Sequence, residues 1–176
     1  MTPRVRKLAL TAHIIVSIGW FGAVSGVLVL AAAGLTSENA GTVSAAYVGT
    51  ELIWRFVILP FSIAAVLTGL TQALGTSWGL FRHYWVLTKF LLGLGALILL
   101  LLHTHSLLPA LSAGEVSSDS RVAHNHAGLP PRVHLVVAAS GTLLLLLTTA
   151  ALSVYKPWGK TPYGRRRAEA HSGAEG

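Results

Sequence analysis

Apolar residues in this chain come in four long blocks, over 8–33, 52–74, 85–105 and 133–155, without the alternating patterns of a soluble domain. Each block approaches or exceeds the roughly 20 residues that a helix needs to cross the hydrocarbon core of a bilayer. We therefore expect an all-α integral membrane protein, a four-helix bundle over residues 1–156. A disordered, basic cytoplasmic tail is expected over 157–176.

The segments between the blocks carry the polar residues and the helix breakers. A partly ordered outer loop is expected over 34–51, and a long outer connection rich in Gly and Pro over 106–132. The first block follows the basic stretch RVRK, but it is longer than the roughly 7 to 15 apolar residues of a signal peptide. It also contains His13 and Trp20, so we expect a retained helix.

Composition narrows the chemistry. Hydrophobic residues make up 53% of the chain and charged residues only 11%. There is no cysteine, which excludes disulfides, thiolate metal sites, iron–sulfur clusters and covalently attached c-type haem. Any metal or cofactor must therefore be held by histidine, lysine, carboxylate or backbone groups.

Basic residues gather at one side of the predicted bundle. That side carries Arg4, Arg6, Lys7, Arg82, Lys156, Lys160, Arg165, Arg166 and Arg167. The other side has only Arg55, Arg121 and Arg132, in loops that also contain acidic residues. The positive-inside rule then predicts that both termini are cytoplasmic, in the cell membrane. The net charge of +7 reports this topology and contact with anionic lipids, and we expect no nucleic-acid partner.

Two ionisable residues define an inner layer within the predicted bundle. Lys89 and His13 each lie about one turn inside the cytoplasmic end of their helices. Such residues are costly in a membrane and normally face the bundle interior. The alternatives are that Lys89 extends to the headgroups and that His13 is an interfacial residue.

The outer layer contains a second candidate site. His103 ends the third predicted helix, His134 begins the fourth, and Arg55 lies near the start of the second. Two histidines on neighbouring antiparallel helices can ligate haem iron from both sides, with an arginine pairing with a propionate. The alternatives are an i, i+4 pair between Arg55 and Glu51 and a helix-entry role for His134.

Histidine pairs at the outer surface offer a different chemistry. One pair is His103 with His105, and the other is His124 with His126 in the long loop. Neutral imidazoles suit copper, zinc or haem iron. A copper site would use these residues, with His134 as a further ligand. No hydrolase or nucleotide-binding motif is present, and no carboxylate lies in a predicted helix centre, which argues against a proton-driven transporter.

Small residues indicate how the helices could meet. Gly22 and Gly26 in the first helix have the spacing that lets two helix backbones approach closely, and Gly93 in the third could be the counterpart.

Four stretches of the chain are informative when taken together, namely LTAHIIVSIGWFGAV, ILPFSIAAVLTGL, YWVLTKFLLGLGALILLLLHTH and SVYKPWG. They resemble the four-helix membrane superfamily that contains CopD-type copper-resistance domains and HemJ-type protoporphyrinogen oxidases. The HemJ branch implies b-type haem, with His13 and Lys89 at the matching histidine and lysine. The chain has PPRVHLVV where that branch has an Asn-Glu-x-Pro element, and VLVLAAAGL where it has a basic, aromatic helix end. These departures argue against porphyrinogen oxidation. The CopD branch implies copper at the outer histidines.

We therefore expect a membrane protein that binds haem b and acts in electron transfer or haem-linked redox chemistry. The residues expected to hold the cofactor are His13, Lys89, His103, His134 and Arg55. The alternatives are a copper-handling protein using His105, His124 and His126, a protoporphyrinogen oxidase-like enzyme, and a non-catalytic assembly subunit. The expected partners are the lipid bilayer and a redox protein or quinone. The sequence does not decide whether the chain forms a homo-oligomer.

Overall fold

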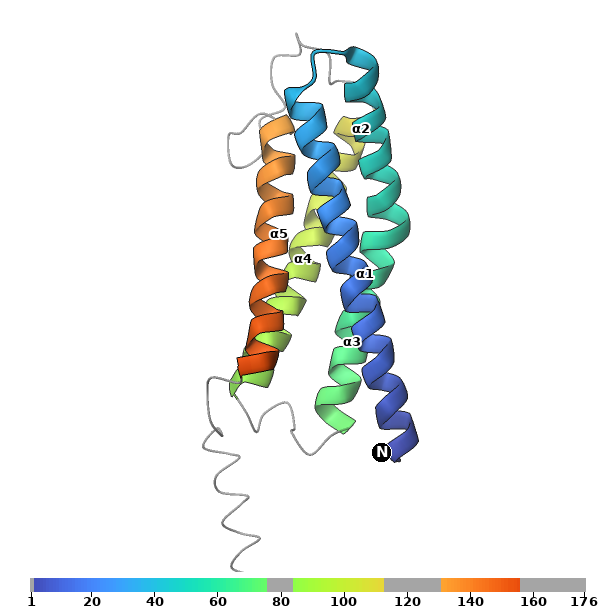
Figure 1. Ribbon diagram of the computed structural model, residues 1–176, viewed down its shortest axis with the longest axis vertical. Helices are drawn as coiled ribbons and strands as arrows, with labels where there is room; N and C mark the ends of the chain where they lie inside the picture. Colours follow the sequence, from blue (N-terminus) through green and yellow to red (C-terminus); the bar gives the residue numbers. More distant parts are fainter. Residues whose placement is uncertain (1, 76–83, 113–130, 156–176) are drawn as a thin grey trace, which may run out of the picture.

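A computed structural model describes residues 2–75, 84–112 and 131–155, with side chains as far as Leu102 in the second range and from Val133 in the third. Every element in these ranges is helical. The elements are α1 (Pro3–Thr36), α2 (Ala40–Ile53), the π-helical turn η1 (Trp54–Ile58), α3 (Leu59–Gly75), α4 (Tyr84–Ser112) and α5 (Pro131–Tyr155). Because α2, η1 and α3 follow one another without a break, the bundle in Figure 1 consists of four long helices.

All four helices are long and apolar enough to cross a membrane, so the chain has the make-up of a multi-pass membrane protein. Their outward faces carry large apolar side chains such as Ile18, Val29 and Leu144, which are more than 60% exposed. Such faces suit lipid and would be unfavourable in water. With 34 residues, α1 is about 50 Å long and therefore exceeds the roughly 30 Å hydrocarbon core of a bilayer.

The second helix begins much earlier than predicted. We expected a partly ordered loop as far as residue 51, but α2 starts at Ala40. Asn39 caps its first turn, with Oδ1 accepting hydrogen bonds from Gly41 N at 2.8 Å and Thr42 N at 3.2 Å. Further along, η1 immediately precedes α3, whose second residue is Pro60. Proline lacks the N–H for a normal helical bond and its ring crowds the carbonyl of Phe56, so a widened turn accommodates it.

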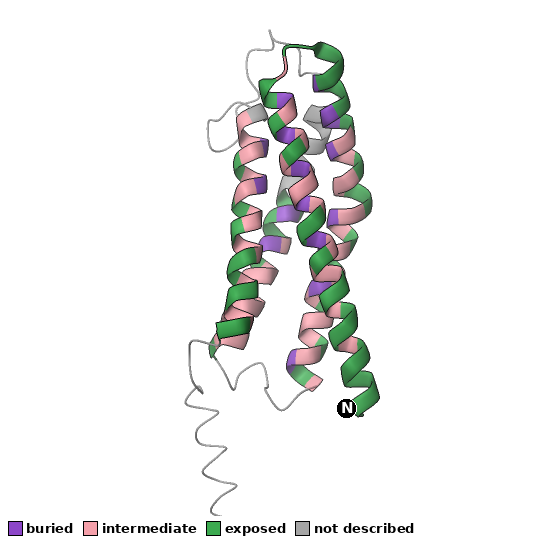
Figure 2. Ribbon diagram, viewed as in Figure 1, coloured by how far each residue is buried: buried purple, intermediate pink, exposed green. Residues whose placement is uncertain are grey.

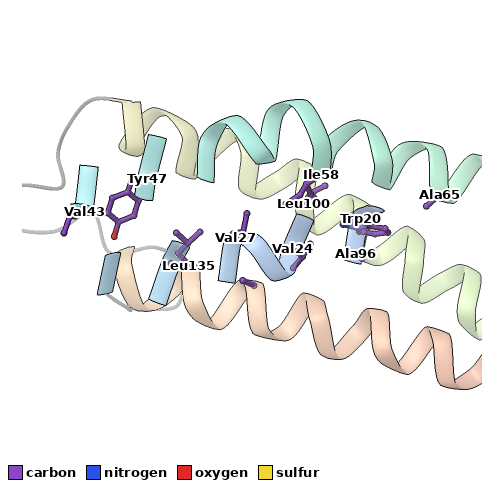
Figure 3. Packing of buried hydrophobic residues seen from close by; sticks show 12 residues of the cluster. Trp20, Val24, Val27, Val43, Tyr47, Ile58, Ala65, Ala96, Leu100 and Leu135 are labelled. Carbon is purple, nitrogen blue, oxygen red and sulfur yellow. The ribbon is translucent and has the colours of Figure 1, made fainter. Parts of the chain in front are cut away.

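The hydrophobic core fills the half of the bundle that contains the end of α1 and the start of α5. Figure 2 shows most of the buried positions in that half, and Figure 3 shows their side chains meeting between the helices. The buried residues of this cluster are Trp20, Val24, Val27, Ala31, Val43, Tyr47, Ile58, Ala65, Ala96, Leu100, Leu135 and Ala139.

The other half of the bundle, toward the N-terminus, is packed as two separate helix pairs. Within α1 and α3, Gln72 Nε2 donates to Ala9 O at 3.2 Å and Ala73 is buried. In contrast, no residue of the described stretches 2–19, 84–95 and 140–155 is buried. Toward this end, α4 and α5 diverge from α1 and α3 in Figure 1. We call this half the open half.

Two of the glycines predicted to bring helices together do not do so. A Cβ on Gly22 or Gly93 would have no heavy atom of the described residues within 4 Å, apart from its own helix and chain neighbours. The prediction was therefore wrong for Gly22 and Gly93, whereas a Cβ on Gly26 would lie 4.0 Å from Ile53 Cδ1. Closer approach occurs at Gly19, where a Cβ would collide with the Phe61 ring, and at Gly69, where it would lie 3.3 Å from His13 Cε1.

Candidate functional site

His13 lies in the open half, on the face of α1 that meets α3. Its ring is half-buried, and its Nδ1 atom lies 3.0 Å from the hydroxyl oxygen of Thr68 on α3. Thr68 of α3 therefore holds the Nδ1 edge of the imidazole.

The hydrogen bonds around Thr68 decide which ring nitrogen carries the proton. The single hydroxyl proton of Thr68 is directed at its own helix, toward Ala64 O at 2.6 Å and Ala65 O at 3.2 Å. The hydroxyl oxygen is thus left to accept a hydrogen bond from His13, so Nδ1 is the donor. In a neutral imidazole, a proton on Nδ1 leaves the lone pair on Nε2. His13 is therefore set up to bind a metal or accept a proton through Nε2.

Gly69 completes the support of the His13 ring. Because a Cβ at this position would lie 3.3 Å from Cε1 and 3.7 Å from Nδ1, the imidazole packs directly on the bare backbone of α3. Any side chain here would push the ring away. Gly69 and Thr68 therefore act together, since both contact the part of the ring that contains Nδ1.

Lys89 supplies the second polar group of the open half. It lies on α4, and its ammonium donates a hydrogen bond to the hydroxyl of Ser153 on α5. This hydrogen bond joins α4 to α5 in the open half.

His13 and Lys89 thus stand on the two walls of the open half. One wall is the α1 and α3 pair with His13 and Thr68, and the other is the α4 and α5 pair with Lys89 and Ser153. Both residues therefore lie in the same half of the bundle, while their place in the inner leaflet stays a prediction. The structure adds the hydroxyl partner of each basic group.

Trp20 lies where the open half meets the tight core. It comes seven residues after His13, so the two side chains leave α1 on the same face, two turns apart. Only 3% of its surface is exposed, yet its indole Nε1 has no hydrogen-bond partner among the described residues. A buried N–H donor of this kind is normally satisfied, so it is suited to a ligand that offers an acceptor.

The outer candidate site is only partly within the described residues. His103 and His105 belong to α4, but their side chains are outside the described part of the structure. His124 and His126 lie wholly outside the described residues. His134 is half-buried in the first turn of α5, at the end of the bundle away from His13. Whether these histidines meet at a haem or at copper stays a prediction.

Arg55 lies in η1 and shows the alternative arrangement that we weighed for it. Its side chain is 59% exposed, and its Nη2 lies 3.8 Å from Glu51 Oε1, one helical turn away. This exposed i, i+4 ion pair is weak at best. It gives no support to a role for Arg55 in holding a cofactor.

Three residues of the inner site escaped the sequence analysis, namely Thr68, Gly69 and Ser153. Hydroxyl residues at membrane depth are uninformative in sequence because most donate to their own helix, as Thr142 does to Ala138 O and Thr148 to Leu144 O. The stretch TGLTQ, with two threonines and a glutamine in an apolar helix, is the signal that could have singled out this part of α3.

Among the described side chains, no group of three or more His, Asp or Glu residues could hold a metal ion. No family model matches the chain, and no curated protein or solved structure matches it. The resemblance to the CopD and HemJ superfamily stays a prediction.

Proposed function

We propose that this chain is a membrane protein that binds haem b through His13 and takes part in electron transfer or other haem-linked redox chemistry. The observation that carries the proposal is the environment of His13. Thr68 holds Nδ1 as a donor and Gly69 packs against the Cε1 and Nδ1 atoms, which leaves the Nε2 lone pair for a ligand. Haem-ligating histidines are typically oriented in this way by a hydrogen bond from the other ring nitrogen.

In this proposal the flat, largely apolar macrocycle packs against the apolar helix faces of the open half, where no residue of 2–19, 84–95 or 140–155 is buried. Haem would supply one-electron redox chemistry at iron. The chain itself would supply the His13 ligand, a positive charge at Lys89 and the unsatisfied indole N–H of Trp20.

The orientation follows from charge. The exposed basic residues Arg4, Arg6 and Lys7 lie at the start of α1, at the end of the bundle that contains His13. By the positive-inside rule this end faces the cytoplasm, so the haem would lie in the inner leaflet of the cell membrane. Because the chain has no cysteine, single cysteines at Thr2 and Glu38 can be tested in intact cells with a membrane-impermeant maleimide. We expect labelling at Glu38 only, and labelling at Thr2 alone would reverse the orientation.

Spectroscopy of purified protein tests the haem. The protein would be purified in mild detergent from haem-replete cells, and oxidised and dithionite-reduced spectra would be recorded with metal analysis of the same sample. We expect a Soret band at a stoichiometry of one haem per chain. A colourless protein that also fails to take up added haem would refute the proposal, and bound copper in that sample would favour the copper alternative.

Variants then locate the cofactor. His13→Ala should lose the Soret band, while the matched control His171→Ala, beyond the end of α5, should retain it. His134→Ala separates the two candidate sites. If His134→Ala loses the band and His13→Ala keeps it, the haem lies in the outer site and the assignment to His13 is wrong.

A further inference from the structure

The described helices contain one acidic residue, Glu51 of α2, and it pairs with Arg55 rather than with Lys89. The chain has six acidic residues, and none of them lies in 2–33, 52–112 or 131–155. Glu51 lies just before this second stretch. In the described part of the chain, the hydrogen-bond partner of Lys89 is the hydroxyl of Ser153, which brings no negative charge.

A lysine kept at membrane depth normally pairs with an anion or with backbone carbonyls. Here the ammonium donates a hydrogen bond to the hydroxyl of Ser153 on the neighbouring helix. A lysine ammonium has three donor hydrogens, and Ser153 takes one of them. The remaining donors and the whole charge are available to an acidic group that enters the open half.

The packing shows where such a group could come from. The described residues of α4 and α5 alongside Lys89 and Ser153 are all half-buried or exposed. The two helix pairs diverge toward this end of the bundle in Figure 1. An amphiphile dissolved in the bilayer could therefore reach Lys89 laterally, without crossing the tight core around Trp20 and Ala96.

From this geometry we infer that Lys89 and Ser153 form a subsite for the carboxylate of a membrane-dissolved amphiphile, on the wall opposite His13. A charge-assisted hydrogen bond from an ammonium to a carboxylate is among the stronger contacts a protein makes. The inference deepens the proposed function, because haem b carries two carboxylates, and it rests on that function only for the identity of the amphiphile. A fatty acid presents the same group.

The test compares pairs of probes that differ only in the carboxylate. In the first arm, the apo protein in phosphatidylcholine nanodiscs is titrated with haem and with haem dimethyl ester, whose carboxylates are capped. In the second arm, palmitate and hexadecanol compete against each other in native mass spectrometry. Each arm uses the wild type, Lys89→Met, Lys89→Arg and Ser153→Ala. Lys7→Met is the matched control, because it removes a lysine charge from the exposed start of α1.

We expect the wild type and Lys7→Met to prefer the carboxylate probe by roughly tenfold in at least one arm. Lys89→Met should abolish the preference, and Lys89→Arg should restore most of it. Ser153→Ala should weaken it several-fold, because the ammonium is no longer positioned. A preference for haem over its ester assigns the subsite to the haem carboxylates, and a preference for palmitate alone assigns it to a lipid carboxylate.

The inference is overturned if neither arm shows a preference in the wild type, or if Lys89→Met keeps the preference. Failure of the proposed function looks different, because the wild type would then bind neither haem nor its ester while the palmitate arm still reports on Lys89. Circular dichroism and size-exclusion profiles confirm that each variant remains folded, so that a lost preference cannot come from a lost fold.

Discussion

Enlarging Gly69 is the sharpest test of how His13 is held. A Cβ at this position would lie 3.3 Å from His13 Cε1 and 3.7 Å from Nδ1. The first distance is shorter than an ordinary carbon–carbon contact of about 3.5 to 4.0 Å, so in Gly69→Ala the ring must move by a few tenths of an ångström. The bond from Nδ1 to Thr68 Oγ1, now 3.0 Å, would then reach the long end of the hydrogen-bonding range.

The expected change in stability is a balance of two terms. Replacing glycine by alanine within a helix stabilises it by roughly 0.5 to 1 kcal/mol, which is similar to the cost of weakening one hydrogen bond, about 0.5 to 1.5 kcal/mol. Gly69→Ala should therefore leave the free energy of unfolding nearly unchanged. Gly69→Val adds two more carbons against the ring and should destabilise the protein by about 1 to 3 kcal/mol.

The assay is unfolding in mixed micelles of mild detergent and SDS, together with haem titration of the same samples. Gly22 provides the matched control, because it is an exposed glycine of α1 whose Cβ would meet no described side chain of another helix. Gly22→Val should cost much less stability than Gly69→Val. Haem affinity should fall roughly tenfold in Gly69→Ala and stay unchanged in Gly22→Ala. Equal effects at the two glycines would refute the packing of His13 on α3.

Three further predictions follow from single contacts. Thr68→Val removes the acceptor of His13 Nδ1 and should lower haem affinity by roughly tenfold to a hundredfold, whereas Thr68→Ser should preserve it; equal haem titrations for Val and Ser would contradict the assigned tautomer. Asn39→Ala removes the α2 cap and should cost about 1 kcal/mol in SDS unfolding, while Asn39→Asp should be tolerated; an unchanged midpoint for Ala would show that the cap contributes nothing. Arg55→Gln breaks an exposed pair with Glu51 and should change stability by less than about 0.5 kcal/mol and leave the haem spectrum intact; a lost Soret band would instead place Arg55 at the cofactor.

The long apolar helices could be predicted because a bilayer sets their minimum length. Each of the four predicted helices falls inside an observed one, since about 20 apolar residues have no stable alternative in lipid. The early start of α2 could not be predicted in this way, because its first residues are small and polar. Its helical state depends on the Asn39 cap and on packing, since Val43, Ala46, Tyr47 and Thr50 are buried at helical spacing.

The candidate site could likewise be predicted only in part. The sequence by itself determined that His13 and Lys89 are unusual, because ionisable side chains are rare and costly at membrane depth whatever surrounds them. Only the tertiary structure decided their partners. Thr68 and Ser153 resemble many hydroxyl residues in apolar helices, and they meet His13 and Lys89 across 55 and 64 residues of chain because α1 packs on α3 and α4 on α5. Depth in the bilayer is a property of each helix alone, whereas hydrogen-bond partners depend on how helices distant in sequence pack together.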